Sequence, residues 1–226
     1  QRPAVLRAAQ AKAAEDGSPE GWCLVEGARR PVARLHPSIK GVRDAQTSGA
    51  NVVSFNERAF ESYGKTQRQG ENAPVGERAA FAYTTALNAL LGRDSPNKVQ
   101  IADATTVLWA DRDDSIEPEL IALFGDDPDV HVDAVRKRLA GATTGNRGAE
   151  DTTLRFFVLG LAPNASRIAV RFWFHDTLER LGPRILQHFD DLRIVRASDR
   201  DAATPAMYWL LRSIAPQGKA ENVPPR

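Results

Sequence analysis

The most constraining feature of the sequence is a pair of extended runs, residues 153–161 and 167–175, joined by the short segment LAPNAS. The second run alternates, and successive side chains of a strand point to opposite faces. One face would carry Ile168, Val170, Phe172 and Phe174, and the other Arg167, Ala169, Arg171, Trp173 and His175. We therefore predict a β-hairpin whose first face builds core and whose six-residue connection is a tight turn.

The rest of the chain mixes helical and extended patterns without a regular strand–helix–strand repeat. Helices are expected over residues 4–14, 54–64, 77–91, 116–124, 132–139 and 178–192, and from Thr204 onward. Further hairpins are expected from residues 23–25 with 31–35 and from 99–101 with 106–109, with a buried strand at Val52 and Val53. This mixture predicts an α+β fold, with helices packed on a mostly antiparallel sheet.

Several helices carry more specific expectations. Ala59, Phe60 and Tyr63 share one face of the 54–64 helix, and the acidic helices at 116–124 and 132–139 are expected at the periphery. Pro183 is expected to kink or restart the 178–192 helix, and Asp176 to cap its N-terminus. The last helix is expected to bury Leu210, Leu211 and Ile214.

Length and composition are those of a globular protein. The 226 residues suit one α+β domain or two closely packed subdomains, about 1–110 and 111–226. The chain begins at Gln1 and stops after GKAENVPPR without a closing element, so we expect a piece of a longer polypeptide. The sequence has no apolar run of membrane-spanning length and only one cysteine, Cys23, so a cytoplasmic protein is expected.

Charge is balanced overall but unevenly distributed. The net charge is +1, which gives no whole-molecule field for nucleic acid. Residues 26–44 are mainly basic, whereas residues 103–129 hold nine carboxylates against Arg112. This asymmetry fits a basic surface for phosphates and an acidic surface elsewhere, but solvated loops explain it equally simply.

Signatures of catalysis are weak. The sequence contains neither a Gly-x-Ser-x-Gly elbow nor a phosphate-binding loop, and Cys23 with His36 has no recognisable catalytic spacing. A metal-dependent nuclease would need converging carboxylates, for which the candidates are Asp103, Asp111, Asp113 and Asp114. Three of these belong to one turn, where they would point into water. We therefore expect no catalytic residue, no metal and no cofactor.

Other polar residues indicate a binding surface. Arg167 and Arg171 could pair with phosphates, and Trp173 beside them could stack on a base. The alternative is that another layer covers this face and that Trp173 shields the arginine stems. A flexible loop with Lys65, Gln67, Arg68, Gln69 and Asn72, and the turn around Asn164, suit either a nucleic-acid backbone or a partner subunit.

Five stretches occur in order along the chain: RLHPSIKGV, SGANVVSFNERAFESYGKTQ, NAPVGERAAFAYTTALNALL, VLGLAPNASRIAVRFW and GKAENVPP. From about Trp22 to the last residue, the chain closely resembles the large subunit of the type I-C CRISPR Cascade, also called the Csd-one family. The resemblance implies a non-enzymatic role in RNA-guided antiviral defence. Family members contact the protospacer-adjacent motif of target double-stranded DNA, help open the duplex and lead to recruitment of the helicase-nuclease.

The resemblance also implies the partners: the other Cascade subunits, the crRNA-containing complex, target double-stranded DNA and the helicase-nuclease, with no membrane. Family chains are longer at both ends, and residues that read the adjacent motif are expected largely in the missing N-terminal part. The nucleic-acid-binding residues expected here are Lys40, Arg43, Lys65, Arg68, Asn72, Asn164, Arg167 and Arg171. Two alternatives stay open, namely a structural scaffold that contacts only neighbouring subunits and a metal-dependent nuclease.

Overall fold

The computed structural model describes residues 19–65, 68–112, 116–123, 133, 136–137, 154–198 and 201–219. The chain divides into two compact units, here called unit 1 (Gln1–Arg93 with Pro163–Ala169) and unit 2 (Asp94–Ala162 with Val170–Arg226). The expected helix at 4–14 and loop at 141–151 lie outside the described residues. Of the expected 132–139 helix only residues 133, 136 and 137 are described, and they are helical. No helix within these ranges is long and apolar enough to cross a bilayer.

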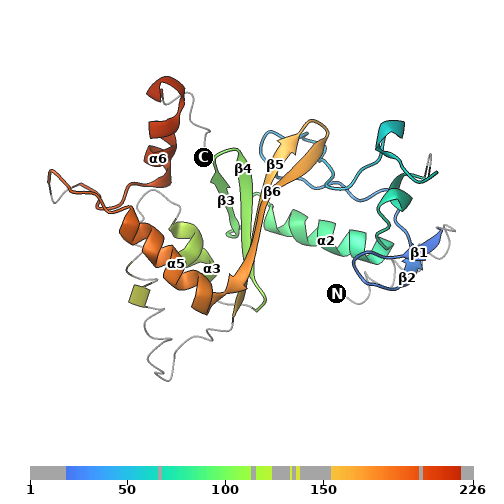
Figure 1. The fold of residues 1–226 in the computed structure, drawn as a ribbon, viewed down its shortest axis with the longest axis horizontal. Coiled ribbons are helices and arrows are strands. Elements are labelled where there is room, and N and C mark those ends of the chain that lie inside the picture. The colour runs from blue at the N-terminus through green and yellow to red at the C-terminus, as the bar shows by residue number, and fades with distance from the viewer. Residues whose placement is uncertain are drawn as a thin grey trace. The chain divides into compact units, whose positions relative to one another are not determined.

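Unit 1 is built around one helix and a small hairpin (Figure 1). Strands β1 (Glu20–Trp22) and β2 (Arg29–Pro31) pair antiparallel, which confirms the first hairpin a few residues before its expected position. Helix α2 (Glu77–Leu90) confirms the expected helix. Its residues Ala79 and Ala80 pack against Cys23, Ala33 and Val75 in a small buried cluster.

Helix α2 also fixes the segment that follows the hairpin. The side chain of Asn88 accepts the Lys40 N–H at 2.8 Å and donates to the Ser38 carbonyl at 3.0 Å. Gly41 has a φ of +86°, and a Cβ there would lie 2.3 Å from the Leu91 carbonyl oxygen. Only glycine fits this close approach without strain.

The segment from residue 52 to residue 64 differs from expectation. Val52 and Val53 are half-buried bends rather than a strand, because only single bridges form beside them, Ile39 with Ala50 and Asn51 with Arg167. The expected 54–64 helix is reduced to one 3₁₀ turn, η1 (Arg58–Phe60). Its residues are exposed, and Tyr63 is 95% exposed, so no buried face stabilises a longer helix. A second 3₁₀ turn, η2 (Gln69–Asn72), precedes α2.

A four-stranded sheet in the order β3-β4-β5-β6 confirms the α+β class. Strands β3 (Lys98–Ile101) and β4 (Ala104–Ala110) form the second expected hairpin, and β4 pairs antiparallel with β5 (Arg155–Asn164). Strand β6 (Arg167–Thr177) follows β5 after a turn at residues 165–166. The expected six-residue connection is therefore mostly strand. The tip of the β5–β6 hairpin, Pro163–Ala169, belongs to unit 1.

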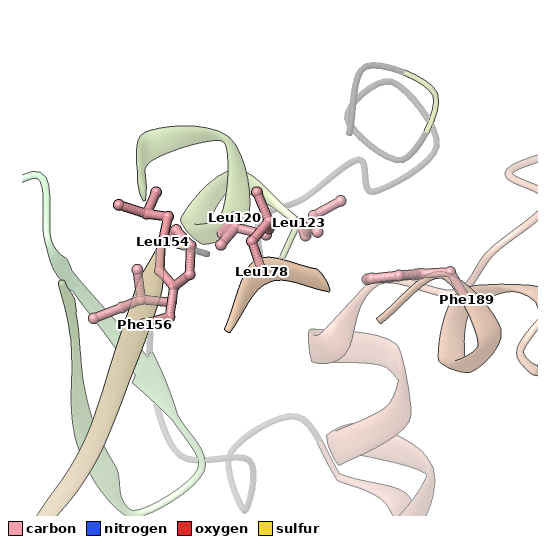
Figure 2. Close-up of a cluster of buried hydrophobic side chains, with 7 residues drawn as sticks. Leu120, Leu123, Leu154, Phe156, Leu178 and Phe189 are labelled. Carbon is pink, nitrogen blue, oxygen red and sulfur yellow. The ribbon is translucent and has the colours of Figure 1, made fainter. Parts of the chain in front are cut away.

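Two helices cover one face of the sheet in unit 2 (Figure 2). Leu120 of α3 (Ile116–Ala122) and Leu178 of α5 (Leu178–Asp191) pack with the sheet residues Leu108 and Phe156. Each such fully buried side chain stabilises the fold by about 1.5–3 kcal/mol. Because α3 contributes to this core, the expectation of a peripheral position for it was wrong.

The C-terminal helices differ in detail from expectation. Helix α5 continues through Pro183 without a restart, and its N-cap is Thr177 rather than Asp176. Asp176 instead accepts the Thr177 N–H at 2.9 Å. Helix α6 (Met207–Ile214) begins two residues after Pro205, and the expected burial of Ile214 was wrong because this residue is exposed. A 3₁₀ turn, η3 (Pro216–Gly218), follows.

Strand β6 contradicts the predicted core face. Ile168 is buried and Phe172 is half-buried, but Val170 and Phe174 are 51% and 62% exposed. The physical reason is that β6 is an edge strand of the sheet. The strand residues of the core beneath α3 and α5 come from β4 and β5, and none of the described members comes from β6.

Candidate nucleic-acid interface

Positive charge is concentrated in unit 1. Among its described residues, 11 basic side chains stand against 7 acidic ones, whereas unit 2 has 12 against 11. Of the eight expected nucleic-acid-binding residues, all but Arg171 belong to unit 1. Since Lys and Arg side chains bind nucleic acid by neutralising individual phosphates, unit 1 is the better suited of the two.

Asn72 closes the loop that ends in η2. Its Nδ2 donates to the carbonyls of Lys65 and Gln69 at 3.3 and 3.0 Å, and its Oδ1 accepts the Ser62 N–H at 3.0 Å. The Lys65 ammonium donates to the Glu71 carbonyl at 2.8 Å. The structure therefore brings Lys65 and Asn72 together, and it uses both side chains to hold the loop.

Two further expected residues carry ion pairs, an exposed one at Arg68 and a partly buried one at Arg43. Arg68 lies 3.2 Å from the Glu71 carboxylate, and Arg43 lies 3.7 Å from that of Asp44. Exposed pairs of this kind contribute only about 0–1 kcal/mol. The Arg68 guanidinium could therefore exchange its carboxylate for a phosphate at little cost to the fold.

Lys40 and Asn164 are the least constrained of the expected residues. Both are exposed, Lys40 after the Ile39 bridge and Asn164 at the end of β5. Within the described residues, neither the Lys40 ammonium nor the Asn164 amide has a hydrogen-bond or ion-pair partner. These side chains remain available to an external ligand.

Arg167 is held by neutral groups. Its guanidinium lies over the Phe60 ring, 4.0 Å from the centroid, and its Nη2 donates to Asn56 Oδ1 at 2.8 Å. A cation–π contact of this kind fixes the side chain without cancelling its charge. Arg167 is thus positioned by unit 1 and keeps its full positive charge.

Arg171 is arranged differently. Its Nη2 lies 2.7 Å from Asp103 Oδ2, in an exposed ion pair within unit 2. The structure therefore separates the two arginines that the strand alternation grouped together. Arg167 presents a net charge, whereas the charge of Arg171 is compensated by its neighbour.

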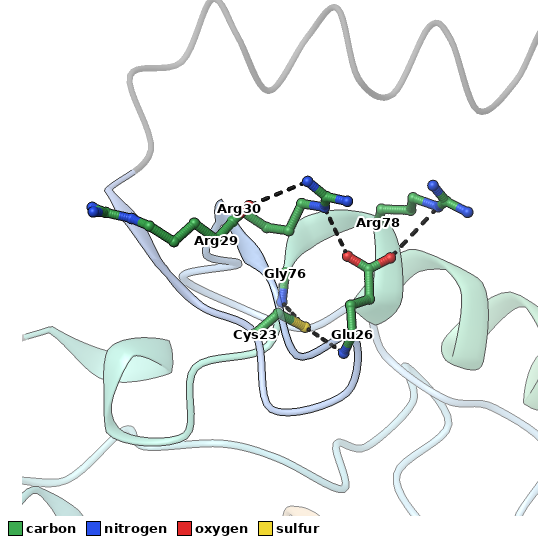
Figure 3. Close-up of polar contacts among 6 residues, drawn as sticks. All are labelled: Cys23, Glu26, Arg29, Arg30, Gly76 and Arg78. Atoms are coloured by element: carbon green, nitrogen blue, oxygen red, sulfur yellow. Dashed lines mark hydrogen bonds and ion pairs between the residues drawn. The ribbon is translucent and has the colours of Figure 1, made fainter.

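Sequence reasoning missed an arginine cluster beside β2 (Figure 3). Glu26 accepts Arg30 Nε at 3.1 Å and lies 3.7 Å from Arg78 Nε. Arg30 Nη1 also donates to the backbone carbonyl of Arg29 at 3.2 Å, whereas the Arg29 side chain extends away from Glu26 (Figure 3). One carboxylate thus faces two arginines. The adjacent Arg29 and Arg30 are visible in the sequence, but nothing there indicates Arg78, 48 residues after Arg30.

The Cys23 thiol lies beneath this cluster at the start of α2. Its buried Sγ accepts the N–H groups of Gly76 at 3.1 Å and Glu26 at 3.4 Å. Burial raises the pKa of Cys23, but hydrogen bonds from the backbone of Gly76, Glu26 and Val25 outweigh burial and lower it. His36 has a separate partner, with Nδ1 2.6 Å from Tyr83 Oη. The two candidate catalytic side chains therefore have different hydrogen-bond partners.

Apolar side chains accompany the arginine cluster. Trp22, Leu24 and Val25 are all exposed in and after β1. The sequence pattern predicted an extended run here and gave no reason to expect its side chains to face solvent. Exposed aromatic and aliphatic groups beside several guanidinium groups are typical of binding surfaces.

The candidate carboxylates do not converge within the described residues. Asp103 pairs with Arg171, and Asp111 Oδ2 lies 3.1 Å from Arg155 Nε. The hydrogen bond from Arg155 lowers the pKa of the Asp111 carboxyl. Asp113 and Asp114 lie outside the described residues. No three His, Cys, Asp or Glu side chains in the described part of the chain form a group that could hold a metal ion.

A family model provides the decisive comparison. The model described as CRISPR-associated protein (Cas_Csd1) matches residues 1–226, the full length of the chain. The chain belongs to this family. The resemblance carried by the five sequence stretches is thereby confirmed. No curated protein sequence matches the chain.

Membership of the Csd-one family makes the chain a CRISPR-associated protein. The match itself assigns no role to any single residue. The eight expected nucleic-acid-binding residues therefore stay predictions, and the structure adds Arg29, Arg30 and Arg78 as candidates of the same kind.

Proposed function

We propose that this Csd-one chain is part of the non-catalytic large subunit of a type I-C, crRNA-guided Cascade complex. The subunit contributes to recognition of target double-stranded DNA at the protospacer-adjacent motif, to strand opening and to recruitment of the helicase-nuclease in antiviral defence in the cytoplasm. The observation that carries this proposal is the family match over all 226 residues.

The charge distribution supports a role for unit 1 at the DNA backbone. Arg167 has neutral partners, and Arg30 and Arg78 share the carboxylate of Glu26. In RNA-guided recognition the guide reads sequence by base pairing while protein groups hold the strands through their phosphates. Side chains with a net positive charge on a CRISPR-associated subunit are suited to the second task, holding the strands through their phosphates.

Leaving the subunit out of the assembled complex tests the function as a whole. Duplex binding that depends on the adjacent motif, and cleavage by the helicase-nuclease, are expected to be lost. Retention of both activities would contradict the proposal. Purified subunit with DNA and magnesium or manganese is expected to leave the DNA intact, and cleavage abolished by Asp111→Asn would favour the nuclease alternative.

A double charge reversal tests the predicted interface. Arg167→Glu with Arg171→Glu, in the full complex, is expected to weaken target-DNA binding and flatten its salt dependence. The matched control is Arg180→Glu with Arg184→Glu, on exposed positions of α5, which changes the net charge equally. Binding equal to that of the wild type, with an intact fold, would exclude the Arg167 and Arg171 assignment.

A scaffold role is a second candidate, and one observation favours it. The functional groups of Lys65 and Asn72 hold a loop, and Arg171 is paired with Asp103. Such groups could brace the subunit against its neighbours without touching nucleic acid. Crosslinking of the assembled complex to labelled target DNA separates the two candidates, because a scaffold predicts no crosslink within residues 1–226.

A further inference from the structure

Four aromatic rings lie side by side on one face of the sheet in unit 2. Trp109 of β4 pairs directly with Phe157 of β5, and their ring centroids lie 5.4 Å apart at 15°. Trp173 of β6 stacks on Phe157 at 5.9 Å and 29°, and His175 lies 6.2 Å from Trp173. We name these four rings the aromatic platform.

The platform faces away from the core of unit 2. Strand alternation places Leu108 and Phe156, which pack beneath α3 and α5, on the opposite face of β4 and β5. On the platform's own face, Val107 and Leu161 are buried further along the strands. At the platform end, Trp173 is 46% exposed and His175 is exposed. The exposed rings of this face therefore lie at the end opposite to Val107 and Leu161.

Guanidinium groups flank the rings. Arg155 precedes Phe157 by two residues, so alternation places it on the same face, and its side chain is exposed. Its Nε donates to Asp111 at 3.1 Å, while its two terminal amino groups have no partner within the described residues. Arg112 Nε also lies 3.6 Å from the Asp111 carboxylate. Arg171 flanks Trp173 in the same way on β6.

We propose that the aromatic platform stacks unpaired bases of single-stranded DNA, with the free amino groups of Arg155 binding the adjacent phosphates. This inference rests on the proposed function, because opening of the target duplex produces such a strand. Every base presents a π face, so rings bind a strand without regard to its sequence, while basic side chains follow its backbone. The exposed Arg155 guanidinium beside the rings supplies the hydrogen-bond donors for the phosphates.

The first test measures how tightly the assembled complex binds an oligodeoxythymidine whose sequence does not match the guide. Trp173→Ala is expected to weaken binding by about 5- to 100-fold, and Trp173→Phe to retain most of it. The matched control is Phe174→Ala, which removes an exposed ring from the opposite face of the same strand. Arg155→Gln, a surface change that leaves the rings in place, is expected to weaken binding and to lower the salt slope by about 0.7.

The second test places 5-iododeoxyuridine at successive positions of the displaced strand in target DNA and maps photocrosslinks. Crosslinks to Trp173 or Trp109 are expected. If the complex opens target DNA normally, yet Trp173→Ala and Arg155→Gln bind like Phe174→Ala, base stacking here is excluded while the proposed function stands. Crosslinks of the displaced strand to other residues, with none to Trp173 or Trp109, would also overturn it. If the complex fails to bind target duplex, the proposed function is refuted. The oligodeoxythymidine assay still decides whether the aromatic platform binds single-stranded DNA.

Discussion

Arg167 and Arg171 should contribute unequally to DNA binding, although they lie four residues apart on one strand. Arg167 is fixed by the Phe60 ring and the Asn56 amide, so Arg167→Gln removes an uncompensated charge. Removing one phosphate contact lowers the slope of log K against log salt by about 0.9 for duplex DNA. Over a fourfold change in salt, this difference amounts to about a 3.5-fold change in relative affinity.

The second perturbation removes the ion pair of Arg171 as a unit. Asp103→Asn combined with Arg171→Gln deletes two charges that lie 2.7 Å apart and cancel each other. The salt slope is therefore expected to stay at its wild-type value. The fold should survive in both variants, because an exposed ion pair contributes about 0–1 kcal/mol and an exposed cation–π contact about 0.5–1 kcal/mol.

The assay is a titration of target duplex onto the assembled complex at four or more potassium chloride concentrations. Thermal unfolding of each variant provides the control for folding. The reasoning is refuted if Arg167→Gln leaves the slope unchanged, or if the paired substitution at Asp103 and Arg171 lowers it as much as Arg167→Gln does. The second result would mean that DNA displaces Asp103 from Arg171.

Three further predictions concern the fold. Gly160→Ala places a Cβ 2.4 Å from the Phe172 ring, so it should cost about 1–3 kcal/mol in urea unfolding, and Phe172→Leu should recover part of that loss. Phe156→Ala leaves a cavity in the core beneath α3 and α5 and should lower the free energy of unfolding by about 3–5 kcal/mol. A loss below about 1 kcal/mol would mean that this core is not continuous. Burial lowers the pKa of His36 below 6.5, so as the pH falls His36 is protonated in the unfolded chain before it is protonated in the folded one. The contribution of neutral His36 to the free energy of unfolding is therefore complete above pH 6.5 and decreases as the pH drops towards the folded-state pKa. His36→Asn should remove this part of the pH dependence between about pH 7.5 and 5.5.

The elements that the sequence predicted well are those with a strong local period. Helix α2 and the hairpins β3–β4 and β5–β6 have clear apolar spacing, and each forms close to its expected residues. The expected 54–64 helix failed because a shared apolar face stabilises a helix only when another element covers it. Phe60 instead lies under Arg167, 107 residues later, in a contact that no local pattern encodes.

The candidate site shows the same limit. Sequence reasoning identified basic residues one by one, but their charge state depends on partners that are distant in the chain. Glu26 joins Arg30 to Arg78, and Asp103 neutralises Arg171 across 68 residues. Whether an arginine presents a net charge to DNA is therefore a property of the fold.

Strand β6 explains why alternation alone cannot separate core from binding surface. A period of two shows that two faces exist, but burial depends on which face a neighbouring layer covers. Because β6 is an edge strand, Phe174 on the predicted core face and Trp173 on the other are both exposed. Their surroundings differ, since Trp173 joins rings from β4 and β5 and is flanked by arginines, whereas Phe174 has only Phe172 as an aromatic neighbour among the described residues. Exposure of an aromatic side chain thus has different consequences on the two faces. Comparing substitutions at these adjacent positions separates the effect of the surroundings from that of losing an aromatic ring.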